Sequence, residues 1–197
     1  MPSGSVSERL NIATNYVDRI GDETIREIEG ETADGRPVEG VKCEHGEHIY
    51  LVLTATGQEH VTLRYSVSGD EAWHVRTLPR TLDLDDPRIN ISQSDIQQAR
   101  SELQNELEAQ PDEIKREFRL NLLELLSKEG CALTLDTENG PLNIHGFTID
   151  KSCYIHDDDF GVGDFDYAVQ TIVNLGWVGG SLLVENYGLG ADAVGQV

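Results

Sequence analysis

Residues 43–48, Cys-Glu-His-Gly-Glu-His, place three kinds of metal-ligating side chain within six positions. A two-residue hairpin turn at His45-Gly46 would bring Cys43 opposite His48, with their Cβ atoms about 5 Å apart. Two ligands are fewer than a structural or catalytic zinc site requires. We therefore interpret the stretch as a hairpin turn that carries a buried thiol. Cys43 and His48 remain the candidates for a metal site, although we predict neither a metal nor a cofactor.

Other side chains could add ligands to this pair if the fold brought them close. The candidates share metal-binding chemistry and lie in the second half of the chain: Cys131, His145, Cys153 and His156. A Cys-His nucleophile pair would also need an orienting group and an oxyanion hole. A metal-binding protein or enzyme that uses Cys43 and His48 with residues 145–159 is therefore the alternative, and a non-enzymatic protein is our first hypothesis.

Two loop stretches resemble ligand-binding motifs in composition but do not match them. The acidic stretch 156–166 does not place glycine at the sixth position of a calcium loop. The glycines near residues 161–163 and 176–180 belong to no phosphate-binding signature, because neither GxGxxG nor Gly-Lys-Ser/Thr occurs. The sequence thus gives no support to nucleotide binding.

The charge of the chain is strongly negative. Asp and Glu number 36 against 15 Lys and Arg, which gives a net charge of −21, yet 38% of residues are hydrophobic, as in a folded protein. The lysines are few: Lys42, Lys115, Lys128 and Lys151. This composition resembles that of halophilic archaeal proteins, in which concentrated salt screens the repulsion between surface carboxylates. An acidic protein from a mesophile that binds a basic partner is the other interpretation.

The same features exclude some partners and locations. No cluster of Lys and Arg offers a positive groove for a nucleic-acid backbone, so we expect no nucleic-acid partner. No apolar stretch approaches the ~20 residues that span a bilayer, and the N-terminus does not have the layout of a signal peptide. The three cysteines form no disulfide framework. We expect a soluble, cytoplasmic protein without a membrane partner.

The first 80 residues predict a helix followed by an antiparallel meander. Apolar residues at helical spacing, with Ser5 as a cap and Gly21 as a stop, indicate a helix over residues 6–20. Four β-prone runs follow, separated by turn residues. The run 49–53 is apolar on both faces, so we expect that strand to be covered at least partly on each side.

The second half predicts a helix pair over residues 92–128 broken near Pro111, and strands over 131–136 and 142–155. A helix over 165–177, a last strand over 181–186 and a loose tail complete the chain. Strands grouped before helices favour an α+β fold, an antiparallel sheet with flanking helices. The expected division is the following: a helix and meander (1–80), a connector (81–91), helices and strands that share one domain with the first part (92–187), and a flexible tail (188–197).

Two stretches resemble a known family. Residues 113–135, "EIKREFRLNLLELLSKEGCALTL", and residues 146–176, "GFTIDKSCYIHDDDFGVGDFDYAVQTIVNLG", are similar to core segments of the type III secretion chaperone-like fold and of archaeal proteins thought to share it. Secretion chaperones of this kind are small acidic homodimers that bind extended segments of client proteins. The resemblance therefore implies a chaperone-like α+β fold and a protein client, although the long helical segment at 92–128 departs from the chaperone pattern.

These observations lead to one functional expectation. We expect a protein-interaction module, a dimeric chaperone or adaptor that binds a polypeptide client or a second copy of itself in high salt. Trp73 and Trp177 are the interaction candidates, because exposed aromatic side chains mark interfaces.

Overall fold

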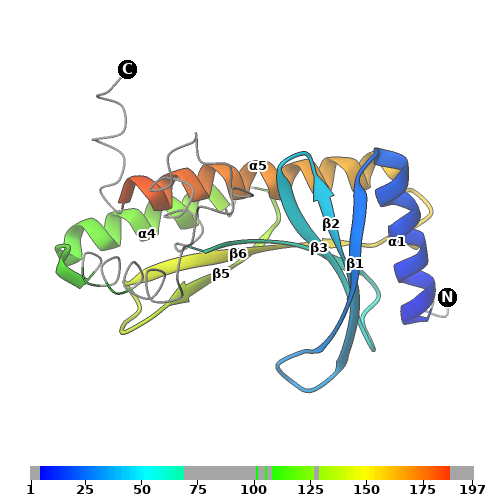
Figure 1. The fold of residues 1–197 in the computed structure, drawn as a ribbon, viewed down its shortest axis with the longest axis horizontal. Helices are drawn as coiled ribbons and strands as arrows, with labels where there is room; N and C mark the ends of the chain where they lie inside the picture. The colour runs from blue at the N-terminus through cyan, green and yellow to red at the C-terminus, as the bar shows by residue number, and fades with distance from the viewer. Residues whose placement is uncertain (1–4, 69–100, 102–104, 106–107, 127–128, 187–197) are drawn as a thin grey trace, which may run out of the picture. The chain divides into compact units, whose positions relative to one another are not determined.

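The computed structural model describes residues 5–68, 101, 105, 108–126 and 129–186 (Figure 1). Its strands form a six-stranded sheet in the order β1-β2-β3-β4-β6-β5. This architecture confirms the predicted α+β class. The elements follow one another as α1 (Val6–Ile20), β1 (Glu23–Glu31), β2 (Pro37–His45), β3 (His48–Ala55), β4 (Val61–Ser68), α4 (Asp112–Leu126), β5 (Ala132–Thr137), β6 (Ile144–Cys153) and α5 (Val162–Asn186).

Helix α1 has the bounds that its sequence predicts. The side chain of Ser5 accepts a hydrogen bond from the Glu8 backbone N–H at 3.2 Å, which satisfies one of the unpaired donors at the helix start. Gly21 ends the helix with a φ of 86°, a conformation that glycine adopts without steric cost. The stripe that contains Ala13 and Val17 is buried, so amphipathic spacing and two caps together define this helix.

The predicted meander is confirmed as strands β1 to β4. Each consecutive pair is antiparallel, and β1 occupies one edge of the sheet. Every residue of β1 except Ile28 is exposed, and glutamates recur along it. Charged side chains on an edge strand discourage pairing with another chain. Strand β1 is therefore a protected edge.

The second half of the chain differs from its prediction at one place. Helix α5 continues to Asn186, so the strand predicted over residues 181–186 is wrong. Gly179 lies inside this helix and against Phe147, and a Cβ there would come within 2.6 Å of the ring. Close packing, rather than a turn, accounts for this glycine. The break at Pro111 is confirmed, because α4 begins immediately after it; most of the residues predicted as the preceding helix lie outside the described ranges.

The chain divides into two compact units. The first contains residues 1–66, 126–133 and 148–176, and the second contains residues 67–125, 134–147 and 177–197. Their boundaries interleave along the sequence. The connector predicted at 81–91 and the tail predicted at 188–197 lie outside the described residues.

Each unit has an apolar core. In the first unit, α1 lies against β1, β2 and β3. Its fully buried side chains come from strands and helices alike: Val17, Tyr50, Val52, Leu63, Ile149, Phe165 and Ile172. The second unit buries Leu122, Ile144, Phe147 and Leu183. Both cores are large enough to make burial of apolar surface the main stabilising contribution.

Two glycines of α5 differ in how closely their neighbours pack, so substituting each by alanine tests close packing and helix propensity separately. A Cβ at Gly176 would clash with the ring of Tyr65, whereas a Cβ at Gly180 would lie 3.5 Å from Cγ1 of Val67, an ordinary contact. Gly176→Ala should lower the free energy of unfolding by about 1–3 kcal/mol, because the ring must shift. Gly180→Ala should raise it by about 0.5–1 kcal/mol, because alanine favours the helix. Urea unfolding of both variants tests this pair, and equal effects would contradict it.

Candidate functional site

A hollow in the first unit lies on one face of strands β1 to β4. It has a volume of about 540 Å³. Most of its floor is apolar, from Ile28, Val38, Leu51 and Leu53, and Arg64 and Asp150 contribute charge. A volume of this size lies in the range of ligand-binding pockets. The remaining lining residues are Gly30, Glu31, Thr32, Ala33, Thr54, Ala55, Gln58 and Thr62.

Strand alternation places these side chains on the same side of the sheet. In β3, Tyr50 and Val52 are buried, whereas Leu51 and Leu53 between them are only partly buried and line the hollow. Successive side chains of a strand point to opposite faces. We call the side with Leu51 and Leu53 the open face. The α1 helix lies on the Tyr50 side. On the open face Leu51 and Leu53 are partly buried and Ala55 is buried, so the expectation that each face of this strand is covered at least partly is confirmed.

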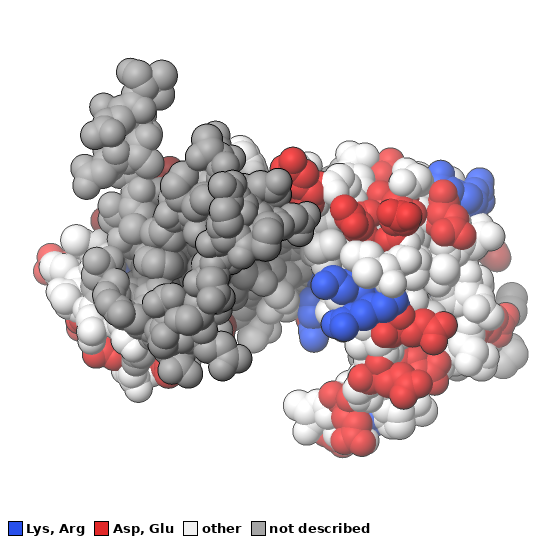
Figure 2. Space-filling model, viewed as in Figure 1, with Lys and Arg blue, Asp and Glu red and all other residues white. Residues whose placement is uncertain are grey.

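Strand register arranges the open face in rows that cross the sheet. Arg26 pairs with Lys42, Lys42 with Leu51, and Leu51 with Arg64, so three cationic residues share one row. The next row consists of Ile28, Gly40, Leu53 and Thr62. We call the first the cationic row and the second the apolar row. Figure 2 shows Lys and Arg atoms gathered over the strands of this unit, with Asp and Glu atoms beside them.

Gly40 is required where the apolar row crosses β2. A Cβ at this position would lie 2.7 Å from Cδ2 of Leu53 and would clash with the Val52 carbonyl oxygen. The absent side chain lets Leu53 lie over the backbone of β2. The apolar row is therefore hollowed at its centre, where a protruding side chain would otherwise stand.

One ion pair closes the cationic row at β6. Nε and Nη2 of Arg64 donate to the two carboxylate oxygens of Asp150, each at 2.7 Å. This bidentate geometry is the stronger form of an arginine–carboxylate pair. The hydrogen bonds that Arg64 donates to Asp150 raise the pKa of the Arg64 guanidinium. Asp150 thereby neutralises Arg64, whereas Arg26 and Lys42 belong to none of the ion pairs among the described residues.

Cys43 and His48 do not face each other. The turn consists of Gly46 and Glu47, one residue later than predicted, and His45 pairs with His48. Cys43 consequently pairs with Tyr50. The shift arises because Gly46, with a φ of 61°, takes the first central position of the turn rather than the second. The Nδ1 of His48 lies 3.0 Å from the Tyr65 hydroxyl.

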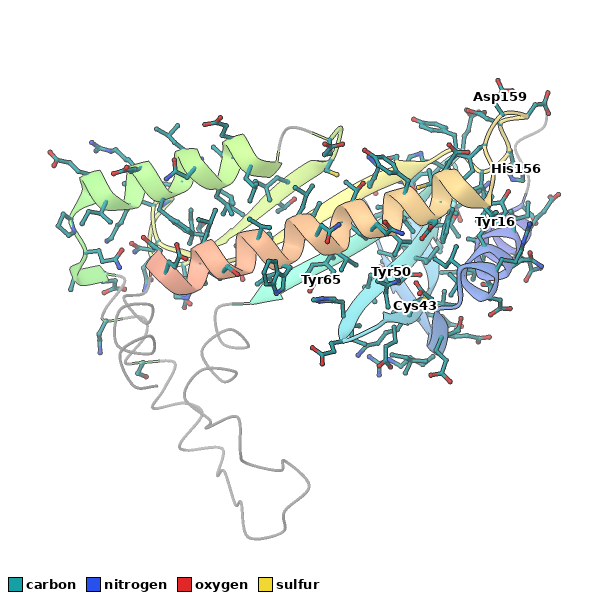
Figure 3. All side chains as sticks on the ribbon, turned by 90° about the horizontal axis from the view of Figure 1, so that it is seen from above. Tyr16, Cys43, Tyr50, Tyr65, His156 and Asp159 are labelled. Atoms are coloured by element: carbon teal, nitrogen blue, oxygen red, sulfur yellow. The ribbon has the colours of Figure 1, made fainter. Side chains whose placement is uncertain are left out.

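Cys43 instead lies beside a polar network at the end of α1. The Tyr50 hydroxyl donates to Oδ2 of Asp22 at 2.8 Å, and Nδ1 of His45 lies 2.7 Å from Oδ1 of the same carboxylate. Burial raises the pKa of Cys43 to about 11, and burial together with the nearby Cys43 and Asp22 raises that of Tyr50. Figure 3 shows Cys43 and Tyr50 on neighbouring strands. A buried neutral thiol of this kind is a poor nucleophile and a poor metal ligand.

The other ligand candidates belong to both units: His145 to the second, and Cys131, Cys153 and His156 to the first. Nε2 of His145 lies 4.0 Å from Oε2 of Glu138, and Cys153 is buried. His156 lies with Asp159 in the loop between β6 and α5 (Figure 3). Within the described ranges, no group of three or more His, Cys, Asp or Glu side chains is arranged to hold a metal ion.

Of the two tryptophans expected to mark an interface, the structure describes Trp177 and not Trp73. Trp177 lies on α5 with 63% of its surface exposed, and its neighbour Val178 is also exposed. Trp73 lies outside the described residues. Trp177 therefore stays an interaction candidate, in the second unit.

The residues of the open face were not singled out as a site from the sequence. A signal was present: Thr62, Arg64 and Ser66 alternate with Val61, Leu63 and Tyr65, which is typical of a strand with one solvated face. Asp150 joins them through strand order alone, because β6 lies beside β4 although 86 positions separate Arg64 from Asp150.

Comparisons with known proteins give a fold and no function. No protein-family model matches the chain, and no curated protein matches it. A crystal structure of an uncharacterized protein from Methanothermobacter thermautotrophicus is similar, with a TM-score of 0.58 and 12% sequence identity over 91% of this chain and 99% of that chain. At this identity the similarity shows the fold alone. No helix among the described residues combines the length and apolarity needed to cross a membrane.

The thiols should differ in reactivity. Burial raises the pKa of Cys43 to about 11 and that of Cys153 to about 12, whereas Cys131 is partly exposed. Near pH 8 the native protein should therefore expose one thiol to an aromatic disulfide reagent, and all three after unfolding in guanidinium. Cys131→Ser should remove the early reaction. Rapid modification of Cys43 in the native protein would contradict the account of its burial.

The Tyr50 hydroxyl should stabilise the first unit. Tyr50→Phe removes the donor to Asp22 and leaves a buried carboxylate with fewer partners, so the free energy of unfolding should fall by about 1–3 kcal/mol. The matched control is Tyr167→Phe, whose exposed hydroxyl donates to Glu129 and should change stability by less than about 0.5 kcal/mol. Similar losses in both variants, measured by urea unfolding, would refute this role.

Proposed function

We propose that this chain is a non-enzymatic protein-interaction module, a chaperone or adaptor whose open face accepts a polypeptide segment of a client. The observation that carries the proposal is the 540 Å³ hollow over Leu51 and Leu53, a partly exposed apolar surface on a folded sheet. A sheet normally buries its apolar face against another layer. A client segment would supply that layer here.

The chemistry of the surface supports binding rather than catalysis. The hollow mixes aliphatic side chains with threonines and three charged residues, and two of the charged residues, Arg64 and Asp150, pair with each other. Cys43, the nucleophile considered from the sequence, is fully buried on the other face of the sheet. Apolar burial also persists in concentrated salt, where attraction between separated charges is screened. A client interface of this type would therefore suit a halophilic, acidic protein with a charge of −21.

Two further parts of the proposal come from the sequence. The resemblance to secretion chaperones suggests a homodimer, and the acidic, lysine-poor composition suggests a halophilic archaeal origin and a cytoplasmic location. Light scattering in concentrated KCl would give the mass of the assembly, which a dimer predicts to be twice 21.8 kDa.

The proposal is tested by affinity capture from a lysate of the source organism in ~2 M KCl, where electrostatic contacts are screened to a few ångströms. The wild-type protein should retain one polypeptide at near-equal stoichiometry. Leu53→Asp places a carboxylate on the open face and should abolish capture. Leu120→Asp makes the same change at an exposed leucine of α4 in the second unit and should leave capture intact.

Two results would count against this function. Capture that survives Leu53→Asp would show that the open face does not bind the client. The wild type and Leu120→Asp should both be folded by circular dichroism. If both are nevertheless recovered without a bound polypeptide, the proposed client does not exist.

A further inference from the structure

We propose that the segment bound by the open face is acidic as well as apolar, and that it lies across the strands with its carboxylates over the cationic row. This inference rests on the proposed function and adds the chemistry of the partner. The chain carries −21 overall, yet one row of one face holds Arg26, Lys42 and Arg64.

The two outer members of that row are available to a ligand. Arg26 is exposed and Lys42 is partly exposed. Neither belongs to the ion pairs found among the described residues, which involve Arg36, Arg64, Arg116 and two histidines. Adjacent strands are about 4.8 Å apart, so the charges of Arg26 and Lys42 are close enough for neighbouring carboxylates of one segment to contact both.

The apolar row lies next to the cationic row, one side-chain repeat along the strands. Residues two apart in a strand lie about 7 Å from each other on the same face. A segment that places aliphatic side chains over Ile28 and Leu53 would therefore bring residues on its flank within reach of Arg26 and Lys42. Amphipathic segments that bury one side in a groove present this arrangement. Carboxylates on that flank would form charge-assisted hydrogen bonds at contact distance.

The edge of the sheet does not offer the same partner a second site. Strand β1 is the edge next to the open face, and it carries Glu27, Glu29 and Glu31, all exposed. An acidic segment that added itself as a strand would meet these carboxylates. Like charges placed directly opposite each other are destabilising. An acidic partner is thus directed to the face rather than to the edge.

A second copy of the chain fits this face poorly. A two-fold interface brings the same patch of both copies together. Where the two-fold axis passes through the cationic row, that row would lie opposite its copy, and Arg26 and Lys42 of one chain would face the same cations of the other. Such self-pairing costs energy at low salt, whereas an acidic segment gains it. A second copy of the chain is therefore the alternative occupant of the open face, and the experiment must distinguish it from an acidic segment.

The test uses fluorescein-labelled synthetic peptides of equal length and the full chain. One peptide alternates leucine with glutamate, a second alternates leucine with lysine, and a third alternates serine with glutamate. In 0.2 M KCl, fluorescence anisotropy should show the leucine–glutamate peptide binding about tenfold more tightly than the leucine–lysine peptide, as two or three contact ion pairs would give. The serine–glutamate peptide should not bind, and in ~2 M KCl the tenfold preference should shrink.

Charge reversal on the face should reverse the preference. The double variant Arg26→Glu/Lys42→Glu should bind the leucine–lysine peptide more tightly than the leucine–glutamate peptide. The control, Arg19→Glu/Arg116→Glu, makes the same change at exposed arginines of α1 and α4 and should behave as the wild type. Amide chemical shifts in NMR spectra should change at Leu51 and Leu53 when the peptide binds.

Each contrary outcome identifies which idea is wrong. Equal binding of both leucine peptides, unchanged by Arg26→Glu/Lys42→Glu and abolished by Leu53→Asp, would overturn the acidic partner and leave the proposed function standing. A dimer that Leu53→Asp dissociates, with no peptide bound, would make a second copy the occupant and overturn the inference. No binding by a monomeric chain would overturn both.

Discussion

The fold and the proposed site depend on one constraint: strand β3 is apolar on both faces, and the described structure buries one face more completely than the other. Tyr50 and Val52 are buried on the side of α1, and Leu51 and Leu53 remain partly exposed on the other. Because side chains alternate along a strand, packing the first pair presents the second pair to the opposite side. The hollow and its rows of side chains on β1, β2 and β4 follow from this placement.

Buried polar contacts hold the covered side in register. Nε of Arg9 donates to the Thr54 hydroxyl at 3.0 Å, and its Nη2 donates to the Ala55 carbonyl at 3.2 Å, which fixes α1 on β3. At the other end of the helix, Asp22 accepts from Tyr50. A one-residue slip of β3 would exchange its two faces and break these contacts. The polar contacts therefore determine which leucines reach the open face.

Local signals made much of the fold predictable and little of the site. Helix α1 followed from its stripe, Ser5 and Gly21, and the meander followed from alternation and turn residues, because these signals act within a few positions. The strand predicted at 181–186 was wrong because helix α5 continues through these residues, and Gly179 before them packs against Phe147, a tertiary contact. The turn lies at residues 46–47, one position later than predicted, so the partner of Cys43 is Tyr50 rather than His48, two residues further along β3. Arg64 and Asp150 meet only through the order of strands, which no local pattern encodes.

The central claim is that Leu51 and Leu53 are accessible in the folded protein, while the alternate side of the sheet is not. The most direct measurement is NMR of leucine methyl groups in the presence of a soluble nitroxide, which broadens the signals of groups that it can approach. The account predicts strong broadening for Leu51 and Leu53 and little for Leu63, Leu122 and Leu183, which are fully buried. Equal protection of Leu53 and Leu63 would show that the open face is covered in solution and would contradict the account.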